Sequence, residues 1–430
     1  MPQTQVPSLP ADLTDLIGRV VHPRHGLITR LHEDPEGAQV GLRLVHANLA
    51  SPLYFRKNAP QAGRAPDCGS GASFDGERAY RAAIGEALER YSASIFWPDQ
   101  LTWAPEGALQ IPPVDLSPLI RVARPEVHDY SPQIARHWVA GRDLADGERR
   151  MVPAALAFLA YEPDDRREII AQSDSTGLAC GTSFDDACLR ALCELIERDT
   201  FASTWLLQRR PPRIAFSPDE RARMPQAVRR AIDHPLFQMA FFHLGRPFDV
   251  HVIASLTWSA DGIGVVAASA SPSVAHAVEK AAAEGLHAWF SAGRQVGQAM
   301  VASPAAFRSP ADHARYYLSP DRFQVVSRIF GEAGSIDYGD LREMADAPTS
   351  AADLARRLQA RGFQATGLDL TSPDVEDLGF RVVRAVVPGL QPLVFGPACV
   401  EVRDRRRLDQ WRATWQLPDA PFNPHPHPFP

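Results

Sequence analysis

The chain has 430 residues, of which 45% are hydrophobic and 22% are charged, and it carries a formal net charge of −6. These values are typical of a globular protein with a large core and two or three domains, and the negative charge argues against a protein that binds nucleic acid by neutralising phosphates. The N-terminus has no basic region followed by an apolar run, and the longest apolar stretches are too short to span a bilayer. We therefore expect a cytoplasmic protein without a signal peptide, a membrane segment or a nucleic-acid partner.

The first 94 residues predict short strands followed by one long helix. Residues 17–50 contain strand-like alternation and are interrupted by Pro23 and Gly26, a pattern typical of strands separated by turns. Residues 51–73 are rich in proline, glycine and arginine and indicate a loop. Apolar positions then recur at helical spacing, which predicts a helix from about Asp75 to Ser94.

The middle of the chain repeats this arrangement. A proline-rich connector at 104–133 precedes a strand-like entry into residues 151–159. A loop of small residues at 173–184 then leads into a second predicted helix, from Asp185 to about Trp205. Because aspartate is preferred at helix N-caps, we expect Asp185 at that position.

The second half of the chain predicts further strands and helices. The expected elements are strands at 249–256 and 262–270, a helix at 274–290, an irregularly helical polar stretch at 308–345, a helix at 350–361 and a strand at 379–387. A solvated helix face is expected for four arginines: Arg403, Arg405, Arg406 and Arg407. Most cysteines are expected to be packing residues, because Cys68, Cys180, Cys188, Cys193 and Cys399 lack the spacing of zinc ligands.

Two of the predicted helices carry the same charged motif, Glu-x-x-Glu-Arg. Its members are Glu86, Glu89 and Arg90 in the first helix and Glu194, Glu197 and Arg198 in the second. Spacings of three and four residues place each trio on one helix face. Two such faces brought together would present four carboxylates to a hard cation such as Mg²⁺, which in turn bridges phosphate oxygens. The arginines would bind phosphate or orient the carboxylates.

A solvated helix face is the alternative interpretation of each motif taken alone. Both copies, however, lie in largely apolar helices, where unpaired charges are costly. Both also follow a small-residue loop that contains Ser-Phe-Asp, and the chain has neither a Gly-x-Gly-x-x-Gly fingerprint nor a Walker A loop. The duplication therefore favours a nucleotide and magnesium site of another kind.

With these motifs the chain resembles the YcaO family. Residues 70–94 and 175–205 are similar to the two signature blocks of that family, residues 21–31 to its N-terminal strand turn, and residues 368–396 to its C-terminal block. The resemblance implies an α/β (α+β) fold with mixed sheets, in which acidic helices bind ATP and Mg²⁺. It also implies three parts: a strand-rich segment at 1–60, an ATP-binding catalytic domain at 61–420 and an extended tail at 421–430.

The resemblance further implies roles for individual residues. Metal and phosphate ligands would be the four carboxylates Glu86, Glu89, Glu194 and Glu197. Nucleotide contacts would extend to Arg90, Thr182, Asp186, Arg198 and Glu284, with Glu197 and Arg198 acting directly in catalysis. Five positions depart from the family pattern: Ala82 and Ala179 replace serine, Thr182 replaces asparagine, Asp186 replaces glutamate and His287 replaces glutamine. We therefore expect altered nucleotide affinity or geometry, with activity retained.

The last ten residues, PFNPHPHPFP, are expected to be extended near polyproline II, because proline removes the backbone donors that a helix or central strand needs. Taken alone, such a tail is typical of a disordered end or of a ligand for an aromatic groove. Within the YcaO family, a terminal Pro-x-Pro-x-Pro resembles the mark of azoline-forming cyclodehydratases, in which the tail reaches back toward the active site. Pro430 is then expected to place its carboxylate beside the reacting amide, as a base or orienting group.

The implied function is cyclodehydration of Cys, Ser or Thr in a ribosomally made precursor peptide, with ATP activating the backbone amide oxygen and a thiazoline or oxazoline as product. Because no leader-binding segment is visible, the resemblance implies a separate E1-like or winged-helix partner and an isolated subunit that is nearly inactive. An FMN-dependent azoline dehydrogenase is a further expected partner for azole formation. Two alternatives stay open: another amide activation, such as thioamide or macroamidine formation, and a non-catalytic scaffold of the same fold, which Ala82, Ala179 and His287 favour.

Overall fold

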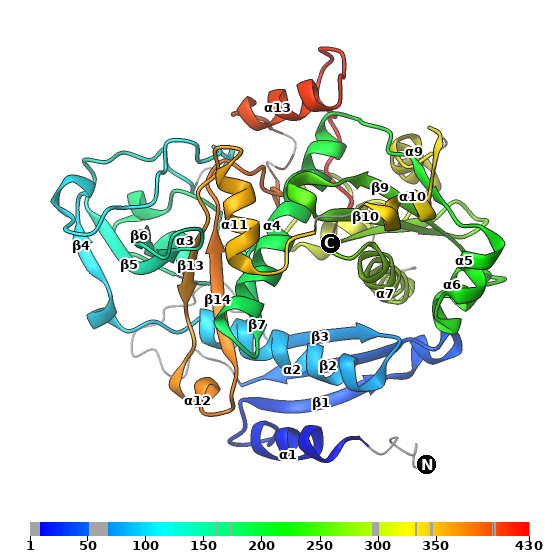
Figure 1. Ribbon diagram of the computed structural model, residues 1–430, viewed down its shortest axis with the longest axis horizontal. Coiled ribbons are helices and arrows are strands. Elements are labelled where there is room, and N and C mark those ends of the chain that lie inside the picture. The colour runs from blue at the N-terminus through cyan, green and yellow to red at the C-terminus, as the bar shows by residue number, and fades with distance from the viewer. Residues whose placement is uncertain are drawn as a thin grey trace.

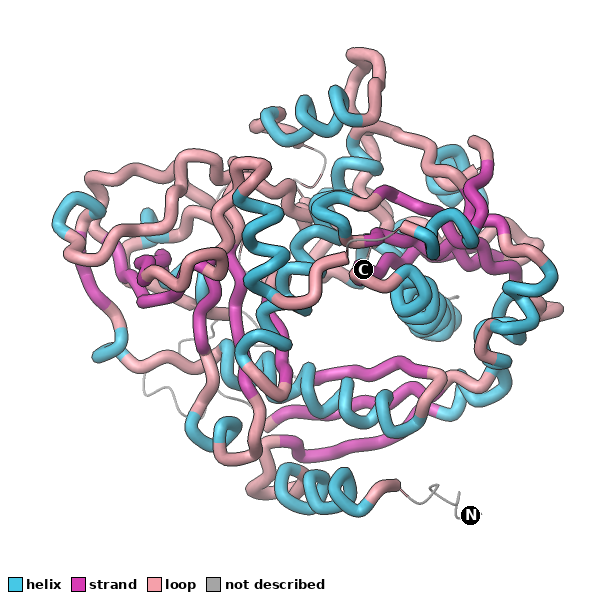
Figure 2. Tube along the Cα trace, viewed as in Figure 1, coloured by secondary structure: helices cyan, strands magenta, loops and turns pink. Residues whose placement is uncertain are grey.

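The computed structural model describes residues 9–50, 68–124, 126–159, 161–172, 174–294, 301–331, 333–344, 347–397, 399 and 401–429. Helices pack around three sheets of three, five and six strands (Figures 1 and 2). Most strand pairs are antiparallel, while β8 (Arg213–Ala215) and β12 (Ser335–Asp337) run parallel. The predicted α/β class with mixed sheets is therefore confirmed. None of the helices within the described ranges has both the length and the apolarity needed to cross a membrane.

The first sheet is an antiparallel ladder in the order β1-β2-β3. Its strands are β1 (Ile28–Asp34), β2 (Arg43–Leu49) and β3 (Cys68–Ser73), with a 3-10 turn at Pro35–Val40. Helix α2 (Gly76–Ala93) lies very close to β3, because a Cβ on Gly71 would stand 2.0 Å from the carbonyl oxygen of Ala79. The predicted helix at 75–94 is confirmed, and the Asp75 side chain caps it by accepting a hydrogen bond from the Arg78 amide.

The strand interpretation of residues 17–50 is wrong for its first four residues, which belong to helix α1 (Ala11–Val20). Leu13, Leu16 and Val20 follow a helical spacing and are all buried. This apolar stripe packs into the same core cluster as α2, and burial of that stripe stabilises the helix.

The six-stranded sheet has the order β4-β5-β13-β14-β7, with β6 beside β5. Its strands are β4 (Thr102–Ala104), β5 (Arg136–Asp143), β6 (Arg149–Pro153), β7 (Leu178–Gly181), β13 (Thr366–Asp369) and β14 (Arg381–Val386). Short helices α3 (Ala154–Ala157) and α12 (Pro373–Glu376) and 3-10 turns at Pro98–Gln100, Glu106–Ala108 and Arg166–Glu168 connect them. The proline-rich connector therefore contains only short elements.

The five-stranded sheet has the order β11-β10-β9-β8-β12. Its long strands are β9 (Gln238–Gly245), β10 (His251–Trp258) and β11 (Gly264–Ser271), followed by helix α7 (Val274–Gly293). This result confirms the predicted strand pair and third helix. The remaining helices are α5 (Pro218–Arg223), α6 (Gln226–Ile232), α8 (Ala311–Tyr316), α9 (Pro320–Ile329), α10 (Tyr338–Glu343), α11 (Ala351–Gln359) and α13 (Arg406–Thr414), with 3-10 turns at Pro247–Asp249 and Pro304–Ala306.

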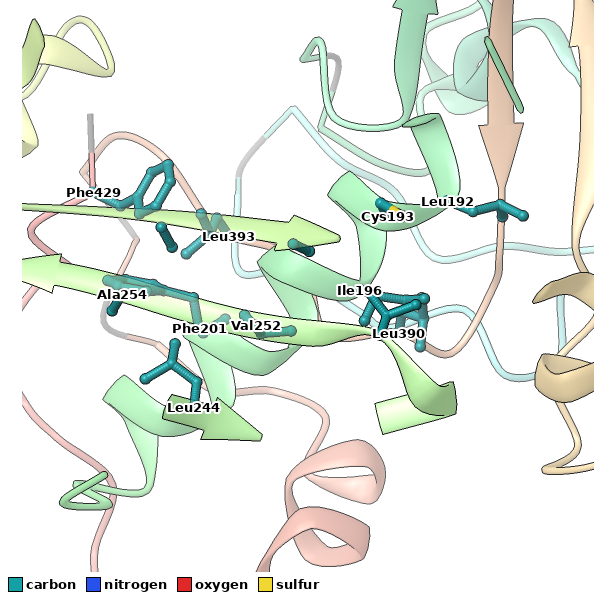
Figure 3. Packing of buried hydrophobic residues seen from close by; sticks show 14 of the residues in the cluster. Leu192, Cys193, Ile196, Phe201, Leu244, Val252, Ala254, Leu390, Leu393 and Phe429 are labelled. Atoms are coloured by element: carbon teal, nitrogen blue, oxygen red, sulfur yellow. The ribbon is translucent and has the colours of Figure 1, made fainter. Parts of the chain in front are cut away.

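Helix α4 (Phe184–Leu206) lies between the five-stranded and the six-stranded sheets (Figure 1). Its apolar side chains share one cluster with residues of β9, β10, β14 and the C-terminal tail. Figure 3 labels members of this cluster from α4, β9, β10 and the tail, among them Phe201, Leu244 and Phe429. Helix α2 packs with Leu178 and Val382, whereas α4 packs with their neighbours Ala179 and Val383. Because side chains alternate along a strand, the two helices cover opposite faces of β7 and β14.

The predicted second helix is confirmed, but its N-cap is Ser183 and not Asp185. The Ser183 hydroxyl accepts a hydrogen bond from the Asp186 amide at 3.1 Å. Asp185 instead lies in the first turn, where its carboxylate accepts a hydrogen bond from the Ala351 amide at 3.2 Å. The small hydroxyl therefore caps α4, while the carboxylate ties α4 to α11.

The expectation of a solvated helix face is wrong for Arg407. Its guanidinium is buried and donates two hydrogen bonds to the fully buried Asp199 of α4, at 2.9 and 2.6 Å. Trp411 and the Gln391 amide also donate to the Asp199 carboxylate, at 3.0 and 2.8 Å. The basic run thus anchors α13 to α4 through one buried ion pair.

We predict that Arg407→Met destabilises the protein by about 3–5 kcal/mol, because it leaves Asp199 charged and buried without its partner. Chemical denaturation measures this loss. Arg405→Met is the matched control, since Arg405 pairs with Asp409 at the surface and should leave the denaturation midpoint nearly unchanged. Equal midpoints for the two variants would show that the buried ion pair does not stabilise the fold.

Candidate functional site

Three helices that bear the acidic residues each begin directly after a strand. Helices α2, α4 and α7 follow β3, β7 and β11, and their N-caps are Asp75, Ser183 and Ser273. Each cap side chain accepts a hydrogen bond from the backbone amide three residues later. These caps fix where each helix starts and therefore where its acidic face lies.

On α2, Glu86 is held by three donors. The Ser70 amide and hydroxyl both donate to its Oε2, the hydroxyl at 3.1 Å, and Arg90 donates to its Oε1 at 2.6 Å. Arg90 also donates to the Cys68 carbonyl. These bonds tie the motif on α2 to strand β3.

Glu89, which directly precedes Arg90 in the last part of α2, lies among like charges. Protein packed around it, together with the negative charges of Glu194 and Glu86, raises the pKa of its carboxyl well above the usual range. Arg90 and Arg384 oppose this shift without cancelling it. The motifs of α2 and α4 are therefore within electrostatic reach of each other.

On α4, Arg198 lies between the two carboxylates of its own motif. Its guanidinium donates to Glu194 at 3.4 Å and lies 3.8 Å from Glu197. Glu194 also accepts a hydrogen bond from the Gly177 amide, and Glu197 accepts one from the Ala270 amide, both at 3.0 Å. The α4 motif is thus fixed to the loop before β7 and to strand β11.

Burial raises the pKa of Glu197 to about 7, although Arg198 and Lys280 favour its charged form. Glu194 and Glu284 add to the increase. Lys280 is a residue that the sequence interpretation missed. Burial among protein atoms disfavours its charge, but Glu197, Glu284 and Glu194 outweigh that effect and raise the pKa of its ammonium. Its position four residues before Glu284 on one helix face was the available signal.

Arg384 of β14 was also missed. It lies between apolar neighbours in the strand RVVRAV, it is buried, and it interacts electrostatically with Asp174, Glu194 and Glu89. A charged residue at the centre of an apolar strand was the sequence signal.

The remaining sequence candidates lie at the start of α4. Asp186 accepts hydrogen bonds from the Thr182 amide at 3.3 Å and from Arg190 at 3.0 Å. The eight residues between Asp186 and Glu194 correspond to about 12 Å of helix. Burial is the largest cause of the raised pKa of the Cys180 thiol, and the charges of Glu89 and Asp186 add to it. Cys180 therefore lies between the α2 motif and the start of α4. Thr182 and Asp186 therefore border the acidic cluster, which consists of Glu86, Glu89, Glu194 and Glu197, rather than join it.

The oxygen donors fit a magnesium-bound nucleotide better than a preformed metal cage. Within the described ranges, no three His, Cys, Asp or Glu side chains approach closely enough to hold a metal ion. The raised pKa values of Glu89 and Glu197 nevertheless mark carboxylates whose charge is incompletely offset. Mg²⁺ prefers carboxylate oxygens and keeps several waters or phosphate oxygens as further ligands. The carboxylates of Glu86, Glu89, Glu194 and Glu197 supply oxygen donors of that kind.

The tail runs along the second half of α4 toward the acidic motif. The Asn423 amide donates to the Leu206 carbonyl at 2.8 Å, and Trp205 donates to the His425 carbonyl at 2.9 Å. Near the end, the Phe429 ring packs against Phe201 with ring centres 4.8 Å apart and lies 4.2 Å from the Arg198 guanidinium. Pro430 lies outside the described residues.

Two histidines fix the tail between α8 and the loop after β14. The His427 ring stacks on His313, with centres 4.2 Å apart, and interacts with the Val394 carbonyl at 3.2 Å. His313 in turn bonds the His427 carbonyl at 3.0 Å. His427 and Phe429 are only 4% and 6% exposed, so the tail is part of the core rather than a loose end.

We predict that the metal-free protein loses stability as the pH rises from about 4.5 to about 7, because of Glu197. An unfolded glutamate ionises near 4.5, whereas the pKa of Glu197 in the folded protein is about 7. Between these pH values the folded state therefore keeps a proton on Glu197 that the unfolded state releases. The contribution of this difference to the free energy of unfolding, about 3 kcal/mol, is present below pH 4.5 and lost by pH 7. Urea unfolding at several pH values measures the effect. The control is Glu197→Gln, whose stability should fall less steeply; identical slopes would refute the prediction.

The sequence profile described as YcaO cyclodehydratase, ATP- and Mg²⁺-binding, matches residues 69–391. An uncharacterised protein in the tfuA 3′ region of Rhizobium leguminosarum bv. trifolii is 32% identical over 158 residues, 37% of this chain and 36% of that protein. An uncharacterised protein of Methanothermobacter thermautotrophicus is 28% identical over 176 residues, 41% of this chain and 42% of that protein. The matched part of the chain thus spans less than half the length of both curated relatives.

Solved structures share the fold. A heterocyclase in complex with substrate and cofactor has a TM-score of 0.75 at 18% identity, covering 99% of this chain and 58% of that one. YcaO from Methanopyrus kandleri bound with AMPPCP and Mg²⁺ has a TM-score of 0.64 at 21% identity, covering 92% of both chains. A chain of the E. coli microcin synthetase McbBCD complex with pro-MccB17 bound has a TM-score of 0.62 at 13% identity, covering 86% of this chain and 90% of that one.

The family match covers about three quarters of the sequence and includes both acidic motifs. The chain belongs to the YcaO family, an ATP- and Mg²⁺-binding cyclodehydratase family.

Proposed function

We propose that this chain is the ATP-dependent cyclodehydratase subunit of a synthetase for thiazole- or oxazole-modified peptides. Family membership supports the use of ATP and Mg²⁺. The observation that carries the choice of azoline formation is the course of the Pro-x-Pro-x-Pro tail along α4, with Phe429 over Arg198. That course brings Phe429 to the motif on α4.

In this proposal the residues of the site have three kinds of role. Glu86, Glu89, Glu194 and Glu197 hold magnesium, and Arg90, Arg198 and Lys280 offset the charge of the triphosphate. Glu284 orients Lys280, while Thr182 and Asp186 border the nucleotide at the start of α4. Magnesium bound there would neutralise charge on the transferring phosphoryl group, and the protein would contribute mainly position and electrostatics.

The proposed reaction has three steps. The thiol or hydroxyl of Cys, Ser or Thr attacks the preceding backbone carbonyl and gives a hemiorthoamide. Its oxygen then takes the γ-phosphoryl group of ATP, and ADP is released. The C–O bond finally breaks, inorganic phosphate leaves with the former amide oxygen, and loss of the N–H proton leaves the C=N bond of the azoline. Each ring therefore consumes one ATP and yields one ADP and one phosphate.

The terminal carboxylate is assigned to proton handling in that sequence. The contacts of Phe429 with Phe201 and with Arg198 of the α4 motif support this assignment. A carboxylate at that place, on Pro430, would accept the proton of the attacking thiol or hydroxyl or orient the amide. The stiff prolines before it limit the entropy lost on placing it there.

We further propose that a separate E1-like or winged-helix protein presents the precursor peptide, and that an FMN-dependent dehydrogenase oxidises the azoline where an azole is made. On this basis the chain alone should modify peptide only very slowly. Addition of the leader-binding partner should restore ring formation. Full ring formation by the chain alone, at the rate of the complete mixture, would contradict the need for a partner.

Mass spectrometry of the precursor peptide tests the proposed reaction. The proposal predicts loss of one water mass per modified Cys, Ser or Thr, dependent on ATP. Fragmentation should place the change at that residue, and acid hydrolysis should restore the original mass. A gain equal to exchange of oxygen for sulfur would indicate thioamide formation instead, and a water loss that joins an N-terminal or lysine amine would indicate an amidine.

A further inference from the structure

Strand β14 carries one charged side chain in the interior of the protein, that of Arg384. Its guanidinium is 4% exposed and donates three hydrogen bonds, all to backbone carbonyls. The acceptors are Thr176 at 2.6 Å, Asp174 at 2.8 Å and Leu156 at 3.1 Å. Two of these three acceptors belong to the loop that precedes β7.

That loop is also held by the next residue of β14. The Ala385 amide donates to the Gly177 carbonyl at 2.8 Å. Gly177 has a φ of +83°, and a Cβ placed on it would stand 2.6 Å from the Ala385 carbonyl oxygen and 3.2 Å from Leu195. The backbone of this loop is therefore clamped against β14 in a conformation that favours glycine.

The clamped loop at 174–177 holds one carboxylate of the acidic cluster, that of Glu194. The Gly177 amide donates to Glu194 Oε2 at 3.0 Å, on the side of the carboxylate away from Arg198. Arg384 is also within electrostatic reach of Glu194 and Glu89, so its charge compensates the interior end of the cluster. Through the loop and through its charge, Arg384 thus acts on the same two carboxylates.

We propose that Arg384 is a positioning residue of the nucleotide site, which fixes the 174–177 loop so that the Gly177 amide holds Glu194 in its ligand orientation. The inference rests on the proposed role of Glu194. A lysine cannot replace the guanidinium fully, because a single ammonium does not match three carbonyls arranged around a planar fork. The conservative variant should therefore restore only part of the function.

Binding of AMPPCP with Mg²⁺ to the isolated chain, measured by calorimetry, tests the proposal without peptide or partner. Arg384→Gln should weaken binding by about tenfold or more, and Arg384→Lys by clearly less. Arg136→Gln is the matched control. Arg136 is equally buried, lies on β5 of the same sheet and donates to the Ser131 carbonyl, but it lies outside the acidic cluster. It should lose stability without losing nucleotide affinity.

Gly177→Ala gives an independent route to the same loop. It should weaken binding on its own, and the double variant with Arg384→Gln should bind no more weakly than the worse single variant, because Gly177→Ala acts only through the amide that Arg384→Gln already releases. Wild-type affinity in folded Arg384→Gln, or an equal loss in Arg136→Gln, would overturn the proposal. Failure of the wild-type chain to bind AMPPCP would instead refute the nucleotide site itself.

Discussion

Replacing Glu197 by Gln is expected to lower both ATP hydrolysis and peptide modification in the reconstituted complex by at least about a hundredfold. Glu197 is 5% exposed, accepts the Ala270 amide at 3.0 Å and lies 3.8 Å from Arg198. The amide of Gln preserves the size and the hydrogen bond but removes the charge that a magnesium ligand needs. Activity should therefore fall while the fold is retained.

Glu89→Gln should have the same effect, since Glu89 interacts with Glu194 across the two helices. Glu77→Gln is the matched control, because Glu77 lies on the same helix but pairs with Arg81 away from the cluster. It should retain nearly full activity. If both reactions persist undiminished in Glu89→Gln and Glu197→Gln, the acidic cluster is not catalytic and the chain is a scaffold.

Deletion of residues 428–430 is expected to nearly abolish ring formation while the protein stays folded. The deletion removes Phe429 from the Arg198 guanidinium, which lies 4.2 Å away, and removes the terminal carboxylate assigned to proton handling. His427 and the bonds that hold the tail to α4 and α8 remain. We expect kcat for peptide modification to fall by about a hundredfold or more.

A substitution separates the ring contact from the chain end. Phe429→Leu keeps an apolar side chain but loses the cation–π contact with Arg198. Because such a contact is worth about 1–2 kcal/mol when desolvated, we expect kcat for peptide modification to fall roughly tenfold. Phe422→Leu is the control, since Phe422 lies over Arg405 and Arg412 at 5.7 and 5.4 Å, far along the tail. Equal effects of both substitutions, or full activity after the deletion, would show that the tail has only a structural role.

The parts of the fold that sequence predicted well are those with local signals. Helices α2 and α4 and the β10-β11-α7 unit follow from apolar periodicity, and the observed bounds differ from the expected ones by a few residues. The small-residue stretches before α2 and α4 were expected as loops, but they contain the strands β3 and β7. The duplicated Glu-x-x-Glu-Arg motif singled out Glu89 and Glu194, and the structure places the two carboxylates within electrostatic reach of each other.

The missed features depend on contacts between distant parts of the chain. Arg407 reads as a surface charge until Asp199, 208 residues away, is seen to pair with it inside the protein. Arg384 likewise acquires meaning only from the loop at 174–177, 208 to 210 residues before it in sequence. The tail alone has the composition of a disordered end, and only the surface formed by Trp205, Tyr317 and His313 orders it. Such partners leave no periodic or spacing signal.

The most direct test of the central claim follows the amide oxygen. A precursor peptide carrying heavy oxygen in the backbone carbonyl before the target Cys, Ser or Thr is incubated with ATP, Mg²⁺ and the reconstituted complex. Phosphorylation of the amide oxygen predicts that the heavy oxygen leaves the peptide and appears in inorganic phosphate, one atom per ring. Heavy oxygen retained in the peptide, or released as water with unlabelled phosphate, would contradict the account.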